Sequence, residues 1–442
     1  MEYWRKEYEQ KLCTAEEAIK LIKSGDHLLV GGNRSRPEHI IKTLIEHASD
    51  YRNVTIKHGL SAGNEFYANE EYSENFNYES LFIPSGIPRK AISEGHATNI
   101  PIGYADIGPS IIADRIHADV FTFQVCPPDR YGFCSCGLNA DFLPEAIQAA
   151  DRIILQINNN MPRSFGPDCT VHISQADAIV EYNEPIPFSK RPDITSVEKK
   201  IGEYCASLIN DGSTIQVGIG AIPNAVCKSL LKKKNLRVHS EMIEDGIMEL
   251  CKAGAITREK SIDEKSPIVT AFVLGSQEMY DYINDNPIFY EARTAYVNNP
   301  FVIAKCHDFI SINSCVEIDI SGQVVAGSAG LRRISGAGGQ LDFVKGANLT
   351  LDGKGKSILA MTSTHSKNGV AHSRIKPFLT KGSSVTVPAQ DTDYFVTEYG
   401  IAHVKGKNRR DTARALIKIA HPDFRPELIN EYERRFKTAY ND

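Results

Sequence analysis

The sequence lacks the features that would place it in a membrane or in a secretory pathway. It has no uninterrupted apolar run of about 18 residues, which is the length that a membrane-spanning helix needs. Its first residues, Met1 to Glu7, are charged and do not resemble a signal peptide. We therefore expect a cytoplasmic protein with no membrane partner.

Charge and cysteine spacing do not indicate a special partner either. A net charge of −5 over 442 residues argues against nucleic acid as a main partner. The ten cysteines are scattered, without the spacing of a disulfide scaffold, and are expected to be reduced thiols. Cys126, Cys134 and Cys136 do cluster, but their spacing differs from that of usual zinc ligands. We expect no metal.

What the sequence does contain is an internal repeat. Residues 25–57 and 211–239 each contain a glycine-containing turn, a strand, a glycine turn, a proline at a helix start, an amphipathic helix and a second strand. Val30 and Val217 occupy matching places 187 residues apart. Such a repeat predicts two tandem open α/β domains with mainly parallel sheets. Prolines and polar residues at 182–187 interrupt both periodicities. We therefore place the domains at 1–185 and 186–442.

Glu241 is the main candidate for chemistry. In the second copy a strand at 213–217 is followed by a glycine turn, a predicted helix at 224–234 and a predicted strand at 235–239, with Glu241 just after it. A unit of this length is a βαβ crossover, so the turn and Glu241 are expected side by side at the carboxyl ends of neighbouring strands. A carboxylate beside free backbone N–H groups is a potential nucleophile next to an oxyanion site.

The first copy has the same scaffold without the carboxylate. When the copies are aligned at Asn53 and Asn235, Gly59 stands where Glu241 stands in the second copy. The first copy is therefore expected to shape an acyl pocket, with residues 31–34 and 58–61 lining it.

Each glycine-rich motif is ambiguous when taken alone. Pro223 stands where a dinucleotide-binding fingerprint would have a third glycine, and it suits the first turn of a helix. Residues 336–339 are either a close approach of backbone to ligand or a flexible surface loop. Lys356, before a predicted strand at 357–361, either meets phosphates or belongs to a solvated hairpin.

Together, the motifs resemble family I coenzyme A transferases of the acetyl-CoA hydrolase/transferase group, particularly 4-hydroxybutyrate and butyryl-CoA:acetate transferases. The resemblance covers nearly the whole chain and rests on five segments, at residues 127–132, 218–223, 239–246, 336–343 and 397–402.

The resemblance implies roles for particular residues. Glu241 would be the nucleophile that becomes a glutamyl-CoA thioester. The backbone of the turn at residues 218–222 would also supply an oxyanion hole. The residues that the resemblance implies for CoA binding are Gly218, Ile219, Gly220, Ala221, Ile222, Asn298, Gly338, Gly339 and Lys356.

The implied activity is a ping-pong transfer of CoA between acyl-CoA and a short-chain carboxylate such as acetate, butyrate, 4-hydroxybutyrate or an itaconate-like acid. A glutamate, with an ordinary pKa of about 4.3, is a carboxylate at neutral pH and needs no general base. Acyl-CoA would be a substrate, with no tightly bound cofactor. Relatives of this kind imply a homo-oligomer, dimeric or higher. The alternatives are an acyl-CoA hydrolase on the same scaffold and a non-catalytic CoA-binding sensor.

Overall fold

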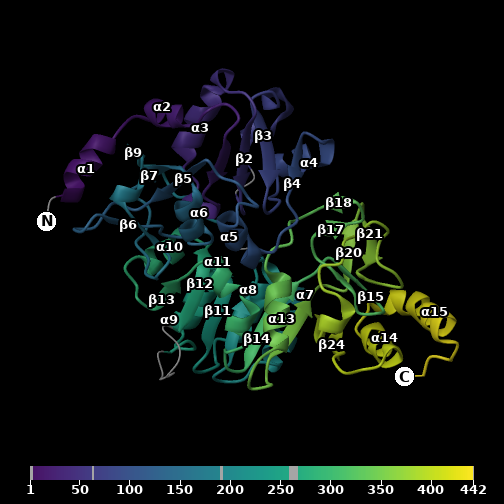
Figure 1. The fold of residues 1–442 in the computed structure, drawn as a ribbon. Helices are drawn as coiled ribbons and strands as arrows, with labels where there is room; N and C mark the ends of the chain where they lie inside the picture. The colour runs from purple at the N-terminus through teal and green to yellow at the C-terminus, as the bar shows by residue number, and fades with distance from the viewer. Residues whose placement is uncertain (1–2, 62–63, 190–192, 258–266, 442) are drawn as a thin grey trace. The chain divides into compact units, whose positions relative to one another are not determined.

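The computed structural model describes residues 3–61, 64–189, 193–257 and 267–441, drawn as a ribbon in Figure 1. The chain divides into two compact units that are not continuous in sequence. The first comprises residues 1–190, 268–297 and 334–338, and the second comprises 191–267, 298–333 and 339–442. The first division falls five residues after the predicted boundary at 185, and the predicted domain limits stay a prediction.

The first unit is built on a parallel sheet with the strand order β4-β3-β2-β1-β5-β7-β9. Its strands are β1 (His27–Val30), β2 (Val54–His58), β3 (Phe76–Ser80), β4 (Ala97–Asn99), β5 (Val120–Val125), β7 (Arg152–Ile157) and β9 (Ala178–Glu181). Two further pairs belong to this unit, antiparallel β6 (Phe133–Ser135) with β8 (Thr170–His172) and parallel β12 (Ile268–Val273) with β13 (Phe289–Glu291). Its helices are α1 (Tyr3–Lys11), α2 (Ala15–Ala18), α3 (Glu38–Glu46), α4 (Ile87–Glu94), α5 (Tyr104–Ile112), α6 (Leu143–Ala149), α10 (Gln277–Ile283) and α11 (Thr294–Val297).

The second unit repeats this plan. Within it the strands follow the order β11-β10-β14-β19-β23-β24, and only the last pair is antiparallel. These strands are β10 (Thr214–Val217), β11 (Arg237–Ile243), β14 (Phe309–Ser314), β19 (Lys356–Ala360), β23 (Tyr394–Thr397) and β24 (Gly400–His403). The helices are α7 (Ser196–Ser207), α8 (Ala221–Ser229), α9 (Asp245–Lys252), α12 (Pro300–Ile303), α13 (Gln340–Asn348), α14 (Arg409–Lys418) and α15 (Arg425–Phe436).

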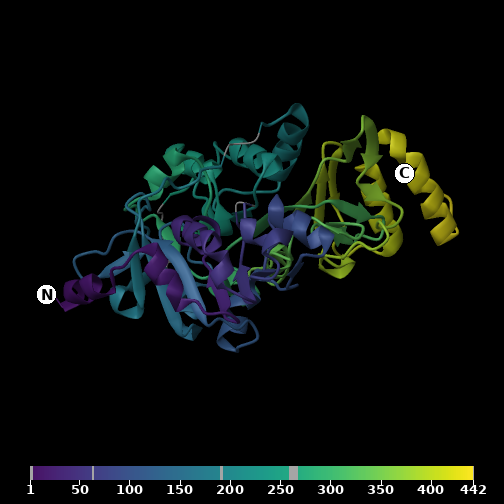
Figure 2. The same ribbon diagram turned by 90° about the horizontal axis from the view of Figure 1, so that it is seen from above.

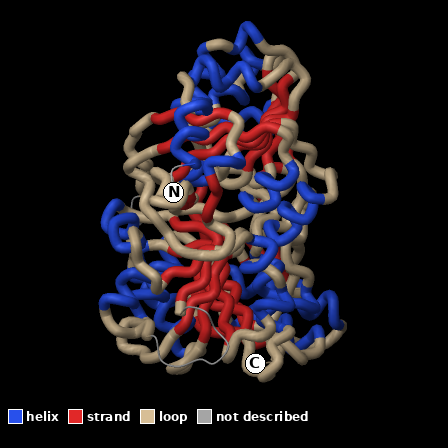
Figure 3. The backbone as a smooth tube through the Cα atoms, turned by 60° about the vertical axis from the view of Figure 1, so that its left-hand side comes forward, coloured by secondary structure: helices blue, strands red, loops and turns tan. Residues whose placement is uncertain are grey.

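Seven short strands of the second unit, between residues 317 and 376, form three small sheets, β16-β15-β22, β17-β18 and β20-β21. They are β15 (Glu317–Asp319), β16 (Val324–Val325), β17 (Ser328–Ala329), β18 (Arg332–Arg333), β20 (Thr364–Lys367), β21 (Val370–Ser373) and β22 (Ile375–Lys376). Ile375 of β22 shares a buried apolar cluster with Phe395 of β23, Leu416 of α14 and Tyr432 of α15. Figures 1 and 2 show α14 and α15 beside these strands. Figure 3 shows strands and helices layered within each unit.

The duplication predicted from the sequence is confirmed. β1 pairs in parallel with β2, and β10 pairs in parallel with β11. Asn53 and Asn235, the matching residues before the second strand of each copy, both adopt left-handed backbone, with φ of 56° and 59°. Asparagine tolerates this conformation better than most residues, so both copies turn in the same way at the same place. The chain has two tandem α/β domains with mainly parallel sheets.

Two predicted elements have different limits in the structure. The helix expected at 224–234 is α8, which begins at Ala221 and ends at Ser229. It begins early because Gly220, with a φ of 109°, makes the sharp turn that starts the helix, and Pro223 fits within its first turn. The strand expected at 235–239 is β11, which continues through Glu241 to Ile243 because the apolar side chains of Met242 and Ile243 are buried.

Among the residues that the structure describes, no helix is both long and apolar enough to span a bilayer.

Candidate active site

Strand register brings Glu241 level with the glycine turn inside the second unit. Thr214 pairs with Arg237 and Ile215 with Val238, a constant offset of 23 residues. Hydrogen bonds extend this offset, since the Ser240 hydroxyl donates to Val217 O at 3.2 Å and accepts from Val217 N–H at 3.4 Å. The next step of the same offset places Gly218 beside Glu241, at the carboxyl ends of β10 and β11.

Asn298 holds the carboxylate of Glu241. The Asn298 Nδ2 donates a hydrogen bond to Glu241 Oε2 at 2.6 Å. Asn298, which follows α11 and precedes α12 in the sequence, is fully buried, whereas the Glu241 residue is partly exposed. Because an N–H donor favours the charged form of a carboxylate, this contact both orients Glu241 and supports its ionised state.

Because Gly339 has no side chain, it leaves room for the hydrogen-bonded side chains of Asn298 and Glu241. A Cβ atom added at Gly339 would lie 2.1 Å from both Asn298 Nδ2 and Glu241 Oε2, far inside any real contact. Gly339 is also the residue before α13, so the amino end of a nine-residue helix lies beside the Glu241 carboxylate. The partial positive charge at a helix N-terminus stabilises an anion placed there.

The glycine turn is accessible and precedes a helix of its own. Ile219 is 47% exposed, and Gly218 and Gly220 are partly exposed. Ala221 and Ile222 form the first turn of α8, and no side chain of Gly220 can cap that helix. The first N–H groups of a helix have no partner within it, so this segment offers donors to an anion.

The Glu244 carboxylate lies near this turn. Burial first, and then the adjacent Asp245 carboxylate, raise the pKa of Glu244 to about 7, while the Gly220 N–H acts in the opposite direction. From the sequence, Glu244 is expected at most to position neighbouring groups and is assigned no catalytic role. The signal that could have found it is its position, directly after a strand that ends beside a glycine turn.

One predicted site residue lies apart from this group. Lys356 begins β19 and pairs with Asp308 Oδ1 at 3.5 Å. Register places it opposite Ile310, which is itself opposite Ile215, so Lys356 lies toward the amino ends of the strands. Gly338 directly precedes Gly339 in the chain and forms a β-bridge with Gly103. The roles assigned to Lys356 and Gly338 stay predictions.

A buried amide pair lies below the turn and was not foreseen. Gln216 Nε2 donates to Asn313 Oδ1 at 3.2 Å, and Asn313 Nδ2 donates back to Gln216 Oε1 at 2.9 Å. The pair joins β10 to β14, one residue before Val217 leads into the glycine turn. Gln216 is a polar residue between the apolar Ile215 and Val217, and that is the signal in the sequence.

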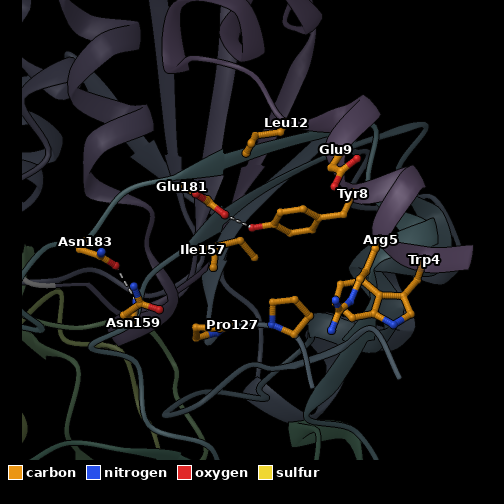
Figure 4. Close-up of a pocket in the computed structure, with 11 residues that line it drawn as sticks. Trp4, Arg5, Tyr8, Glu9, Leu12, Pro127, Ile157, Asn159, Glu181 and Asn183 are labelled. Atoms are coloured by element: carbon orange, nitrogen blue, oxygen red, sulfur yellow. Dashed lines mark hydrogen bonds between the residues drawn. The ribbon is translucent and has the colours of Figure 1, made fainter. Parts of the chain in front are cut away.

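The first unit contains a separate cavity of about 590 Å³, shown in Figure 4. It lies where α1 crosses the carboxyl ends of β5, β7 and β9. Tyr8 reaches from α1 and donates a hydrogen bond to the Glu181 carboxylate, and burial raises the pKa of Tyr8. Trp4 Nε1 donates to Arg130 O at 3.2 Å. No predicted site residue lines this cavity.

Segments 31–34 and 58–61 follow β1 and β2, and their role in an acyl pocket stays a prediction.

The described residues contain no group of three or more His, Cys, Asp or Glu side chains arranged to hold a metal ion. Cys126, Cys134 and Cys136 are buried free thiols, and burial raises the pKa of each.

Comparison with known proteins identifies the family of this chain. Residues 1–190 match the acetyl-CoA hydrolase/transferase N-terminal domain, and residues 275–432 match the corresponding C-terminal domain. The chain is 44% identical over 434 residues to a 4-hydroxybutyrate coenzyme A transferase of Clostridium kluyveri, covering 98% of this chain and 100% of the relative. It is 39% identical over 438 residues to a butyryl-CoA:acetate CoA-transferase of Anaerostipes caccae, covering 98% of each.

A solved structure shows the same fold. The 4-hydroxybutyrate CoA-transferase of Porphyromonas gingivalis superposes with a TM-score of 0.81 at 34% identity, covering 98% of this chain and 100% of that one. The chain belongs to the acetyl-CoA hydrolase/transferase family and is a CoA-transferase.

Proposed function

We propose that this CoA-transferase moves CoA between short-chain acids by a ping-pong mechanism in which Glu241 carries the CoA. The observation that carries the proposal is the held carboxylate, with Asn298 Nδ2 at 2.6 Å from Glu241 Oε2 and Gly339 leaving both atoms their space. The proposed acids are 4-hydroxybutyrate, butyrate and acetate, because relatives named for them match nearly the full chain.

The first half-reaction forms the carrier. An oxygen of the Glu241 carboxylate attacks the thioester carbonyl of acyl-CoA, and the C–S bond breaks to release CoA thiolate. The thiolate then attacks the Glu241 carbonyl carbon of the mixed anhydride. The C–O bond to that carbon breaks, which frees the first acid as a carboxylate and leaves CoA on Glu241 as a thioester.

The second half-reaction reverses these steps with another acid. The incoming carboxylate attacks the glutamyl thioester, thiolate leaves, and the thiolate attacks the acyl carbon of the new anhydride. Glu241 is released as a carboxylate. Each attack creates an oxyanion, and the proposed donors to it are N–H groups of residues 219–222, because the Gly218 N–H already donates to Ile312 O at 3.1 Å. Loss of one such donor typically costs about 3 kcal/mol of barrier height.

The test looks for the covalent carrier. The protein is incubated with butyryl-CoA without acceptor and digested with trypsin, which releases residues 238–252 as one peptide. Tandem mass spectrometry should place CoA on Glu241, and added acetate should remove it. Glu241→Ala should form no adduct and lose turnover, whereas the matched control Glu249→Gln should behave like the wild type. Absence of an adduct with several acyl-CoAs, together with normal turnover of Glu241→Ala, refutes the proposal.

The same incubation separates the two remaining activities. A hydrolase would release free CoA without an acceptor acid, whereas a transferase needs the acceptor. A non-catalytic sensor would bind CoA without turnover. The homo-oligomeric state and the cytoplasmic location stay predictions, and light scattering in solution tests the first.

A further inference from the structure

The second unit contains a basic cavity that lies outside the glycine turn and the Glu241 site. It has a volume of about 550 Å³ and lies between the β20–β21 hairpin and the start of α15. That volume falls within the range of roughly 300–1,000 Å³ that small-molecule pockets occupy. The charged side chains that line it are two histidines, two lysines and one glutamate, namely His365, His372, Lys367, Lys376 and Glu427.

Strand pairing gathers three of the basic groups on one face of the hairpin. His365 and Lys367 are two residues apart in β20, so their side chains leave the strand on the same side. His372 of β21 is the direct cross-strand partner of His365, which places its side chain on that side too. The two imidazole rings stack with their centroids 5.4 Å apart. The hairpin therefore presents a cluster of cationic groups to the cavity.

The positive charge of this cluster is largely left without a counter-charge. Of the basic side chains that line the cavity, only Lys376 has an ion-pair partner among the described residues, Glu317 Oε2 at 2.5 Å. Burial lowers the pKa of His365, and the surrounding positive charges, of which Arg374 acts most strongly, lower it further. Because like charges repel one another here, an anion bound among them would be stabilised.

Phe378 gives the cavity a fixed aromatic wall. Arg435 Nη2 of α15 donates a hydrogen bond to Pro377 O at 2.8 Å. The guanidinium carbon of Arg435 lies 4.8 Å from the centroid of the Phe378 ring, and a cation over an aromatic face is attracted to it. Phe378 nevertheless remains 57% exposed. An aromatic surface is thus held in place beside the basic cluster without being covered.

We propose that this cavity binds a nucleoside phosphate, with a phosphate group on His365, Lys367 and His372 and the base against Phe378. Lysine and imidazolium groups donate charge-assisted hydrogen bonds to phosphate oxygens, and an aromatic ring offers a base a surface on which to stack. The inference goes beyond the proposed function, because it assigns no role to Glu241.

Two kinds of molecule carry this chemistry. CoA ends in an adenosine diphosphate with an additional 3′-phosphate, and free nucleotides such as ADP have the same parts. β20 begins four residues after the carboxyl end of β19. In the sheet β19 is the third strand along from β11, or about 14 Å away at the usual strand spacing. CoA carried on β11 is therefore one source of the nucleoside phosphate, and a free nucleotide is the other.

The test measures binding of adenosine 3′,5′-bisphosphate, ADP and adenosine to the full chain by isothermal titration calorimetry. The two phosphorylated probes should bind more tightly than adenosine. Lys367→Glu should raise their Kd by about tenfold or more, because it replaces a charge-assisted contact with a repulsive one. Phe378→Ala should raise it by about fivefold or more through the loss of stacking. Lys232→Glu, a matched change at an exposed lysine of the same unit outside the cavity, should leave Kd within twofold.

Steady-state kinetics then identifies the source of the ligand. If Lys367→Glu also raises KM for butyryl-CoA, the ligand is the nucleotide end of CoA. If it weakens ADP binding without changing that KM, the ligand is a free nucleotide.

Three outcomes overturn the inference. They are no saturable binding of either phosphorylated probe, equal affinity for adenosine and ADP, and the same Kd in the wild type and Lys367→Glu. The CoA adduct on Glu241 tests the proposed function separately. An adduct that forms normally, together with any of these three outcomes, leaves the proposed function standing and refutes the nucleotide site alone.

Discussion

Gly339→Ala adds one methyl group in the place where the structure leaves no room for it. The backbone of Gly339, with φ of −101° and ψ of 3°, is open to alanine, so the substitution introduces no backbone strain. The new Cβ would lie 2.1 Å from Glu241 Oε2 and from Asn298 Nδ2. The substitution therefore tests the position of the carboxylate while the fold stays intact.

The size of the effect follows from this distance. Ordinary contacts of a Cβ begin at 3.4 Å, so the carboxylate and the amide must each retreat by about 1.3 Å, or the start of α13 must shift by as much. A displacement of about 1 Å at a reacting group can cost roughly 100-fold in rate, or about 2.7 kcal/mol of activation free energy. We expect kcat of Gly339→Ala to fall by about that factor.

The assay is steady-state transfer from butyryl-CoA to acetate, together with thermal unfolding. The control is Gly346→Ala in the same helix, whose Cβ would lie 2.4 Å from Ile303 Cγ2. Overpacking of this kind typically costs about 1–3 kcal/mol of stability. The control should therefore melt at a lower temperature and keep kcat within about twofold. A Gly339→Ala enzyme with kcat within threefold of the wild type would refute the assignment of the site.

Three further substitutions have distinct expected outcomes. Asn298→Asp replaces the donor at 2.6 Å with a second carboxylate, so steady-state kcat at pH 7 should fall by about tenfold or more and recover in part at lower pH. Burial raises the pKa of Glu291 well above its usual range, so the stability from its neutral form is complete below about pH 4.5 and is lost as pH rises toward the folded-state pKa. In urea unfolding the wild type should therefore lose stability as pH rises above that value, whereas Glu291→Gln, which stays neutral, should lack this pH-dependent loss. Arg36→Met leaves the fully buried Glu65 carboxylate without its 3.0 Å partner and should cost about 3–5 kcal/mol in the same measurement.

The sequence predicted the scaffold because local residues determine it. Glycine and asparagine at left-handed positions, proline in a first helical turn and apolar strands all act over a few residues. Asn53 and Asn235 therefore mark the same turn in both copies through their residue type and spacing alone. The pairing register of β10 and β11 then places Gly218 beside Glu241, and no further information is needed to predict that these two residues are neighbours.

The contacts of the carboxylate could not be predicted in this way. Asn298 lies 57 residues from Glu241 in the sequence, and only tertiary folding brings the two together. The residues alone left the glycine segment at 336–339 undecided between a ligand approach and a loose loop. Gly339 is buried, and the reason for a glycine there is a neighbouring side chain that no local pattern encodes.

Glu241 and Glu244, at the carboxyl end of β11, lie in environments that favour opposite charge states. Glu241 must be ionised to attack a thioester, and the Asn298 N–H and the start of α13 both favour the charged form. Glu244, three residues on, lies partly buried beside Asp245, and that environment favours the neutral form. The two glutamates are only three residues apart, so their surroundings, and not the residue type, make them different. The Asn298 N–H is the part of those surroundings that contacts Glu241 directly. Asn298→Asp should therefore impair Glu241 most strongly at high pH, where the new carboxylate is ionised.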